Sequence, residues 1–301
     1  MDIITHAAAG IVLGSPLIVE KPAVSVCFAV GAVLPDLDAF ARLFGKLTFM
    51  KQHRTFSHSI AGTLVCALVL PTLCFGQFQL ENSLALALGM AGHLLFDWIN
   101  LYGLMLLYPF SKKRYCRHYF FFFDAPIFAM SLLALSATIY ALYFQPEFTL
   151  LLWIALGYCM AMAIMITWRI VLYYQGMKLF VGEKVVLIPD AFWPWKFIGI
   201  VDHGDVAVPI VVNALTQSIK RGEPIAILDL EYSDLLEKQP EYQAMRDLMP
   251  MYRCVQCILG EDRMTLVCRE LAIRNFGGLF GTLEINYDPN TKTLVKKVFH
   301  V

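Results

Sequence analysis

HRTFSHSI, residues 53–60, is the stretch from which the fold and the function of this chain are best read. It places two histidines, an arginine and several hydroxyl residues immediately before an apolar run that continues to Phe75. Such a concentration of polar side chains at the start of a hydrophobic segment predicts a functional site at the boundary between membrane and water.

The composition of the chain is that of a membrane protein. Of 301 residues, 58% are hydrophobic and only 16% are charged, and the mean hydropathy is +0.60. Soluble domains carry roughly 25% charged residues. The formal net charge is +0, so no overall positive field attracts nucleic acid, and a nucleic-acid partner is not expected. The start of the chain has no basic region of the kind that precedes a cleaved signal peptide.

Residues 1–177 are expected to form a helical integral membrane domain. Six apolar segments precede residue 177, and the first two are short; the segments cover about 4–19, 22–35, 57–75, 80–101, 119–144 and 148–174. The last four are long enough to cross the roughly 30 Å hydrocarbon layer as helices. Whether the first two cross fully is left open.

Lysine and arginine are concentrated in alternate loops, which predicts the orientation in the membrane. Ten basic residues lie in or after the loops that would share one side: Arg42, Lys46, Lys51, Arg54, Lys112, Lys113, Arg114, Arg117, Lys178 and Lys184. The opposite loops contain only Lys21. These counts predict an inner-membrane protein with both termini in the cytoplasm.

Residues 178–301 are expected to form a β-rich α+β domain in the cytoplasm. Short β-branched runs bounded by Pro, Gly and Asp, such as 184–189 and 195–201, are typical of strands. Residues 233–249 look helical, with Pro240 interrupting the pattern. The pair Cys254 and Cys257 lies in a predicted strand, where residues three apart face opposite sides, so we interpret these cysteines as packing residues.

Histidine and aspartate side chains gather at the predicted cytoplasmic ends of the apolar segments. His93 and Asp97 are four residues apart and share one helix face. Pro35 ends the second segment, so that the following carboxylates project from a turn. The candidate metal ligands are His6, Asp36, Asp38, His53, His58, His93 and Asp97.

Imidazole and carboxylate ligands without thiolates suit Zn²⁺, Mn²⁺ or Fe. The set exceeds what one four-coordinate ion needs, so one or two ions are expected, with zinc preferred. Asp124 is a candidate for a further ligand or a general base. Arg54 could bind a phosphate group. Ser57 could cap the following helix or donate a hydrogen bond to a ligand.

Each of these residues also has a structural interpretation. A histidine at a helix start is usually a cap, and an aspartate after proline is an ordinary turn residue. Basic residues in a loop can serve only to set the membrane topology. Charged groups within the bilayer are costly and usually functional, so His93 and Asp97 are the hardest to explain structurally. The joint pattern favours a shared metal site.

Several motifs resemble the YdjM/YbcI-like family of membrane-bound metal-dependent hydrolases. The resemblance covers about residues 1–130 and rests on T-H-x-x-x-G (5–10), L-P-D-x-D (34–38), H-R-x-x-S-H-S (53–59) and G-H-x-x-x-D (92–97). P-F-S (109–111) and D-x-P (124–126) also resemble that family. The C-terminal part resembles YfhP-like members. The ligand types are similar to those of zinc-dependent phospholipase C and P1-type nucleases, which implies a phosphoester substrate.

The sequence therefore predicts a membrane-bound metal-dependent hydrolase that acts on a lipid or lipid-linked phosphoester at the cytoplasmic membrane face. A rival interpretation is a non-enzymatic membrane anchor or regulator whose β-rich domain binds a cytoplasmic protein partner. A transporter would need polar residues through the full depth of the membrane, and the outer halves of several segments are nearly apolar.

Overall fold

The structure is a computed structural model, and it describes residues 1–249, 251–260, 262–272 and 281–300. Residues 250, 261, 273–280 and 301 of the predicted β-rich domain lie outside the described part. The chain forms two compact units. The first contains 1–43 and 52–170, and the second contains 44–51 and 171–301.

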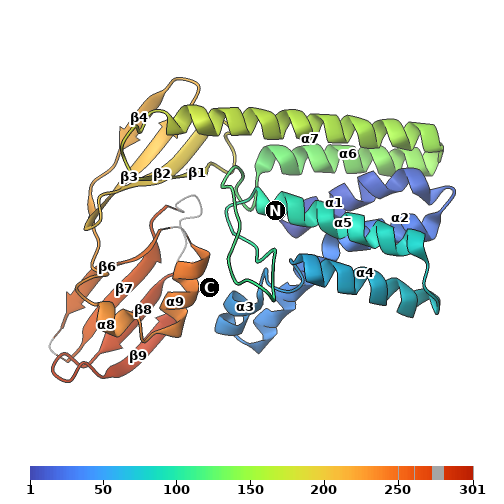
Figure 1. Ribbon diagram of the computed structural model, residues 1–301. Helices are drawn as coiled ribbons and strands as arrows, with labels where there is room; N and C mark the ends of the chain where they lie inside the picture. Colours follow the sequence, from blue (N-terminus) through green and yellow to red (C-terminus); the bar gives the residue numbers. More distant parts are fainter. Residues whose placement is uncertain (250, 261, 273–280, 301) are drawn as a thin grey trace. The chain divides into compact units, whose positions relative to one another are not determined.

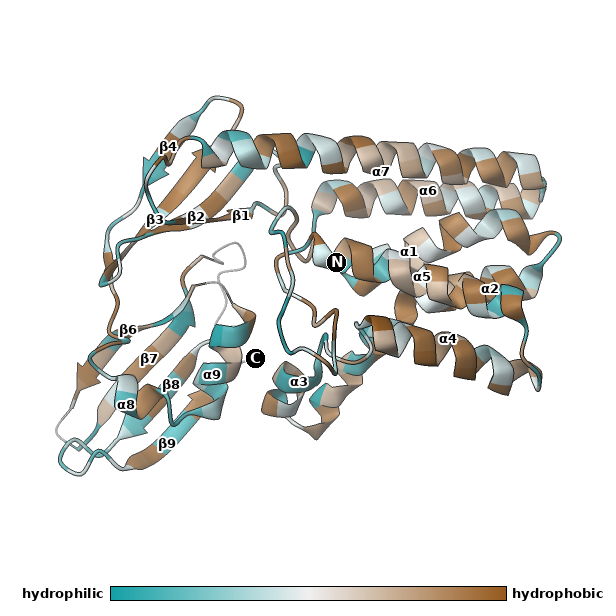
Figure 2. Cartoon of the chain, in the orientation of Figure 1, coloured by the Kyte–Doolittle hydropathy of each residue, from teal (hydrophilic) through white to brown (hydrophobic). Residues whose placement is uncertain are grey.

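The first half of the chain is helical, as expected (Figure 1). Its elements are α1 (Ile3–Gly14), η1 (Ser15–Ile18), α2 (Pro22–Val33), η2 (Leu34–Phe44), α3 (Lys46–Gln52), α4 (Ile60–Phe75), α5 (Leu80–Trp98), α6 (Ala125–Phe144) and α7 (Phe148–Met177). Figure 2 shows that α4, α6 and α7 consist mostly of hydrophobic residues.

Among the described residues, three stretches are long and apolar enough to cross a membrane: Pro22–Phe44, Ala125–Phe144 and Phe148–Met177. The second expected segment, predicted as short, is therefore a candidate span once η2 is added to α2. By contrast, α4 has 16 residues and is shorter than the roughly 20 residues that a span needs. The predicted number of about six membrane helices is thus not confirmed.

Two helix starts differ from the sequence prediction. We expected a helix from about 119, but α6 begins at Ala125, because the Asp124 side chain accepts a hydrogen bond from the amide of Ile127 and caps it. We expected Ser57 to cap α4, but the cap is Ser59, whose Oγ accepts from the amide of Gly62 at 2.9 Å. The cap at Ser57 was wrong because the backbone turns into the helix only after Ser59.

Helices α2 and α5 pack closely because glycines face backbone at their contact. A Cβ atom on Gly89 would lie 2.1 Å from the carbonyl oxygen of Phe28, and one on Gly31 would lie 2.3 Å from that of Leu86. Without a hydrophobic driving force between helices in lipid, such small residues allow the van der Waals contact that joins them. This contact holds α5, which carries His93 and Asp97, against the helix that leads into Asp36.

Gly89→Ala is expected to destabilise the helical unit by about 1–3 kcal/mol, because the added methyl group overpacks the α2–α5 contact. The substitution should also lower the metal content of purified protein, since it separates the helices that carry the candidate ligands. Thermal unfolding in detergent measures the first effect. Gly92→Ala in the same helix is the control, because a Cβ atom there meets nothing within 4 Å. Equal stability of the two variants would contradict the prediction.

The second half of the chain contains two antiparallel sheets. Their strands are β1 (Val185–Pro189), β2 (Lys196–Asp202), β3 (Val206–Asn213), β4 (Ser218–Arg221), β5 (Ile225–Ala226), β6 (Tyr252–Leu259), β7 (Met264–Glu270), β8 (Leu283–Tyr287) and β9 (Leu294–Phe299). The first sheet has the order β1-β2-β3-β4, with β5 also on β3, and the second has the order β6-β7-β8-β9. The β-rich character predicted for this region is confirmed.

Short helices and the end of α7 complete this unit. The predicted helix over 233–249 is split into α8 (Ser233–Leu236) and α9 (Pro240–Leu248), because Pro240 starts a new helix. Leu172, near the end of α7, packs in one buried cluster with Leu187, Phe197 and Val212 from the first sheet.

Candidate metal centre

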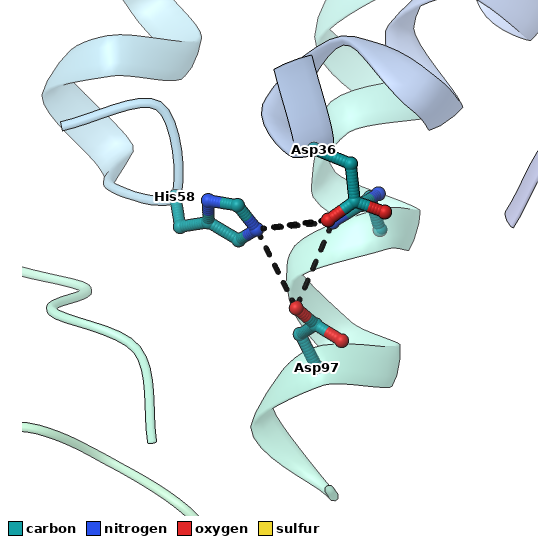
Figure 3. Close-up of side chains that lie close together, drawn as sticks. Asp36, His58 and Asp97 are labelled. Carbon is teal, nitrogen blue, oxygen red and sulfur yellow. Dashed lines mark hydrogen bonds and ion pairs between the residues drawn. The ribbon is translucent and has the colours of Figure 1, made fainter. Parts of the chain in front are cut away.

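Asp36, His58, His93 and Asp97 converge in the helical unit. Each offers one nitrogen or oxygen atom, and these atoms all lie within 4.8 Å of one another. Figure 3 shows Asp36, His58 and Asp97 pointing toward one another. Three of the residues are 0–1% exposed, and Asp36 is 8% exposed. Four residues from three separate parts of the chain thus meet in one buried place, as the sequence predicted.

Local structure places each of the four side chains. His93 and Asp97 are one turn apart in the last turns of α5 and share a face. Asp36 follows Pro35 in the first turn of η2. His58 directly precedes the cap residue of α4. All four therefore lie at or near the end of a helix, where the backbone can bring side chains of different segments together.

Hydrogen bonds fix the tautomers of the two imidazoles. Nδ1 of His93 lies 2.8 Å from the carbonyl oxygen of Ala32, which can only accept, so Nδ1 must carry the proton. Nδ1 of His58 lies 3.0 Å from Oδ2 of Asp38, and the carboxylate likewise requires a proton there. Each neutral ring then presents the lone pair of Nε2, and the two Nε2 atoms are only 3.2 Å apart.

Two facing lone pairs beside two carboxylates require a positive charge. Oδ1 of Asp36 lies 3.6 Å and 3.5 Å from Nε2 of His58 and of His93. Oδ2 of Asp97 lies 3.5 Å and 3.7 Å from the same two nitrogens. A proton or a metal ion between these atoms removes the repulsion. The donor set of two imidazoles and two carboxylates, without thiolate, suits a divalent metal ion.

The pKa of His58 reflects this electrostatic environment. Burial disfavours its charged form, but hydrogen bonds with Asp36, Asp38 and Asp97 outweigh burial and raise the pKa of His58 to about 10. The carboxylates therefore create a strong site for a cation at this ring.

Asp38 is not one of the four converging residues, but it contacts several side chains next to them. Its Oδ1 lies 2.6 Å from Nδ1 of His53. Its Oδ2 accepts from Oγ of Ser57 at 2.7 Å and from the amide of Arg54 at 2.9 Å, in addition to its contact with His58. Carboxylates that orient a ligating histidine in this way commonly raise metal affinity. Ser57 therefore contacts a carboxylate next to the four residues, and its expected role in the site stays a prediction.

Arg54 bridges two of the carboxylates. Its backbone has a φ of 61°, which is uncommon for a residue with a side chain, and its amide donates to Asp38. Its guanidinium forms an ion pair with Asp97, with 2.9 Å to Oδ2, and donates to the carbonyl oxygen of Tyr102 at 2.6 Å. Within the described residues its Nε has no hydrogen-bond partner. One donor of this buried cation therefore remains for a further acceptor.

His6 lies against the cluster from α1. Its ring stacks on that of His93 with centroids 3.7 Å apart, and its Nε2 lies 3.4 Å from Oδ1 of Asp97. That nitrogen is buried and has no hydrogen-bond partner among the described residues. His6 is thus positioned to take part if the centre holds a second ion, as the sequence suggested.

Asp124 makes a separate contact that sequence analysis missed. It is 2% exposed and pairs with Arg169 of α7, which is 0% exposed. The expected role of Asp124 as a ligand or base stays a prediction. The signal for Arg169 was available, because it is the lone charged residue in an otherwise apolar stretch of membrane length.

Comparison with known proteins found a curated relative and a family model that match this chain. A similar curated protein is the Uncharacterized protein YfhP of Bacillus subtilis (strain 168), 31% identical over 149 residues, or 45% of this chain and 46% of that protein. The chain thus spans about half the length of the curated relative that it matches. No solved structure matches the chain. The family model of the YdjM inner membrane protein matches residues 1–178, which include all of the candidate site residues. The chain therefore belongs to the YdjM inner membrane protein family.

Proposed function

We propose that this protein is a membrane-bound metal-dependent hydrolase of a lipid or lipid-linked phosphoester, with its centre at the cytoplasmic face of the inner membrane. The observation that carries the proposal is the convergence of Asp36, His58, His93 and Asp97, with the Nε2 atoms of both imidazoles 3.2 Å apart. The distribution of basic residues in the loops supports the cytoplasmic face.

The residues around the centre supply what hydrolysis of a phosphoester requires. A divalent ion in such a site acts as a Lewis acid on a phosphoryl oxygen and lowers the pKa of water. Asp38 keeps the proton of His58 on Nδ1, so that Nε2 remains a ligand. Arg54 contributes a permanent positive charge beside the ligands, suited to an anionic transition state.

A phosphoester is preferred over other substrates because of Arg54. Guanidinium groups bind phosphate well, since they offer several donors in a fixed plane. Neutral substrates such as amides carry no anionic group that the guanidinium could bind before the reaction begins. The membrane location favours a lipid or lipid-linked substrate over one that is freely soluble.

The proposal is tested with the full chain purified in detergent and supplied with total membrane lipid extract and with a soluble phosphodiester. We expect phosphate or headgroup release that stops when the metal is removed by a chelator and returns when Zn²⁺ or Mn²⁺ is added back. His93→Ala should abolish release, and Glu20→Gln, an exposed acidic residue of the same unit, should leave it unchanged.

Metal binding without turnover of any phosphoester would favour the anchor interpretation, in which the centre is structural and the β-rich unit binds a partner. Activity that survives both chelation and His93→Ala would contradict the proposal directly.

A further inference from the structure

η2 has one polar and one apolar face. It is a 3₁₀ segment of 11 residues, and in such a helix residues three apart lie directly above one another. Leu37, Phe40 and Leu43 are spaced by three and form one row, and they are 46%, 64% and 80% exposed. Asp36, on the same segment, is buried in the metal centre. One short element therefore carries a candidate ligand and an exposed apolar ridge.

The apolar ridge of η2 directly follows α2, whose exposed surface is also apolar. α2 and η2 together form the stretch Pro22–Phe44, which is apolar and long enough to cross a bilayer. On α2 the exposed side chains are also apolar, including Val26 and Val30. The chain is a member of an inner membrane protein family, so lipid is the solvent next to α2. A row of large apolar side chains at the end of such a stretch is expected in the same solvent.

Basic residues beside the exposed apolar ones indicate the headgroup layer. Arg42 lies in the last turn of η2 and is exposed. Phe110, 91% exposed, is followed by the exposed Lys112 and Lys113. Apolar side chains alternating with Lys and Arg are typical of segments that lie in the interface of a bilayer with anionic lipids. This charge pattern favours a lipid surface over an apolar surface of another protein.

The least buried side chains around the metal centre come from η2 and from the segment just before His58. The side chains of Asp36, Asp38 and His53 are 10%, 12% and 24% exposed, while those of His58, His93 and Asp97 are fully buried. The exposed Phe56 lies on the segment between His53 and His58. The least buried side chains of the centre thus lie on η2 and on the segment with Phe56, both of which carry exposed apolar side chains.

We propose that η2 lies in the headgroup layer of the bilayer, with Leu37, Phe40 and Leu43 inserted among the acyl chains, and that the metal centre receives lipid phosphoesters directly from that leaflet. The location of η2 stands independently of activity. The delivery of a lipid substrate rests on the proposed function. A phosphoester with acyl chains matches both surfaces, since its chains fit the ridge and its phosphate fits the centre.

Lipid contact is tested by fluorescence quenching with Phe40→Trp in the full chain, reconstituted in phosphatidylglycerol–phosphatidylcholine vesicles. The emission added relative to the wild type is measured with acyl-brominated lipid and with aqueous acrylamide. We expect roughly twofold quenching by brominated lipid and little by acrylamide, as for a side chain in the interface. Leu133→Trp, 71% exposed on α6, serves as the lipid control, and Val295→Trp, 64% exposed on β9, serves as the aqueous control.

Quenching of Phe40→Trp by acrylamide but not by brominated lipid would overturn the proposal, because η2 would then face water. Protection from both quenchers would also overturn it, and would point to a protein cover. If that protection is lost on dilution of the protein in the vesicles, the cover is a second copy of the chain.

Delivery of the substrate is tested with the double variant Phe40→Ser/Leu43→Ser. We expect an unchanged zinc content, at least a tenfold loss of activity on the lipid phosphoester, and unchanged activity on a soluble phosphodiester. Equal loss on both substrates, or loss on neither, overturns delivery from the leaflet. If the wild type hydrolyses neither substrate, the proposed function fails, and the quenching result still decides where η2 lies.

Discussion

Asp36→Asn is expected to lower the affinity of the purified protein for Zn²⁺ by about 100-fold or more, a larger loss than removal of a residue that only orients a ligand. The substitution keeps the size of the side chain but removes its negative charge. The oxygen that lies 3.5 Å and 3.6 Å from the two Nε2 atoms then becomes a weaker metal ligand. Asp36 is a better choice than Asp97, because Asp97 also pairs with the buried Arg54 and its loss would destabilise the fold. Metal content by mass spectrometry and zinc titration against a competing chelator measure the effect.

Two further variants distinguish a residue that binds the metal ion from one that only orients a ligand. Asp38→Asn should reduce the affinity by only about 10- to 100-fold, because Asp38 contacts Nδ1 of His58 rather than the ligand atoms. Glu20→Gln should have no effect. An Asp36→Asn protein that retains wild-type zinc affinity while Asp38→Asn loses it would show that the ion lies on the other side of His58, near His53.

The helical part of the fold was largely predictable because apolar length and turn residues are local signals. The expected apolar segments at 22–35, 80–101 and 148–174 correspond to α2, α5 and α7 with ends shifted by a few residues. The start of α6 was misplaced because the aromatic run before Asp124 is as hydrophobic as the helix itself. Hydropathy cannot distinguish the two, whereas the sequence Asp-Ala-Pro does mark a helix start.

The site was predictable as a group of residues but not in its internal roles. Polar residues that are costly in a membrane signal function wherever they occur, and this principle found His93 and Asp97. It could not distinguish Asp36 from Asp38, because their roles depend on η2 being a 3₁₀ helix after Pro35. The contacts of Arg54 depend on its positive φ, which no local pattern predicts for an arginine. Spacing thus identified the candidates, and backbone conformation assigned them.

The buried pair of Asp124 and Arg169 gives the second large expected effect. Arg169→Met should destabilise the helical unit by about 3–5 kcal/mol, because it leaves the carboxylate of Asp124 buried without its cationic partner. Methionine retains much of the length of the side chain, so the loss of packing is small. Unfolding of the full chain in mixed micelles, titrated with a denaturing detergent, measures the change.

A double-mutant cycle separates the ion pair from other contributions of these residues. Asp124→Asn keeps an oxygen that can cap α6 and removes the charge. The Asp124→Asn/Arg169→Met variant should therefore be more stable than Arg169→Met alone, since no unpaired charge remains. Trp168→Phe, at the neighbouring and partly exposed position of α7, is the control and should change the stability by less than about 0.5 kcal/mol. Additive effects of the two substitutions would show that the pair contributes no coupling energy. Strong coupling would instead establish that the ion pair holds α7 to the start of α6.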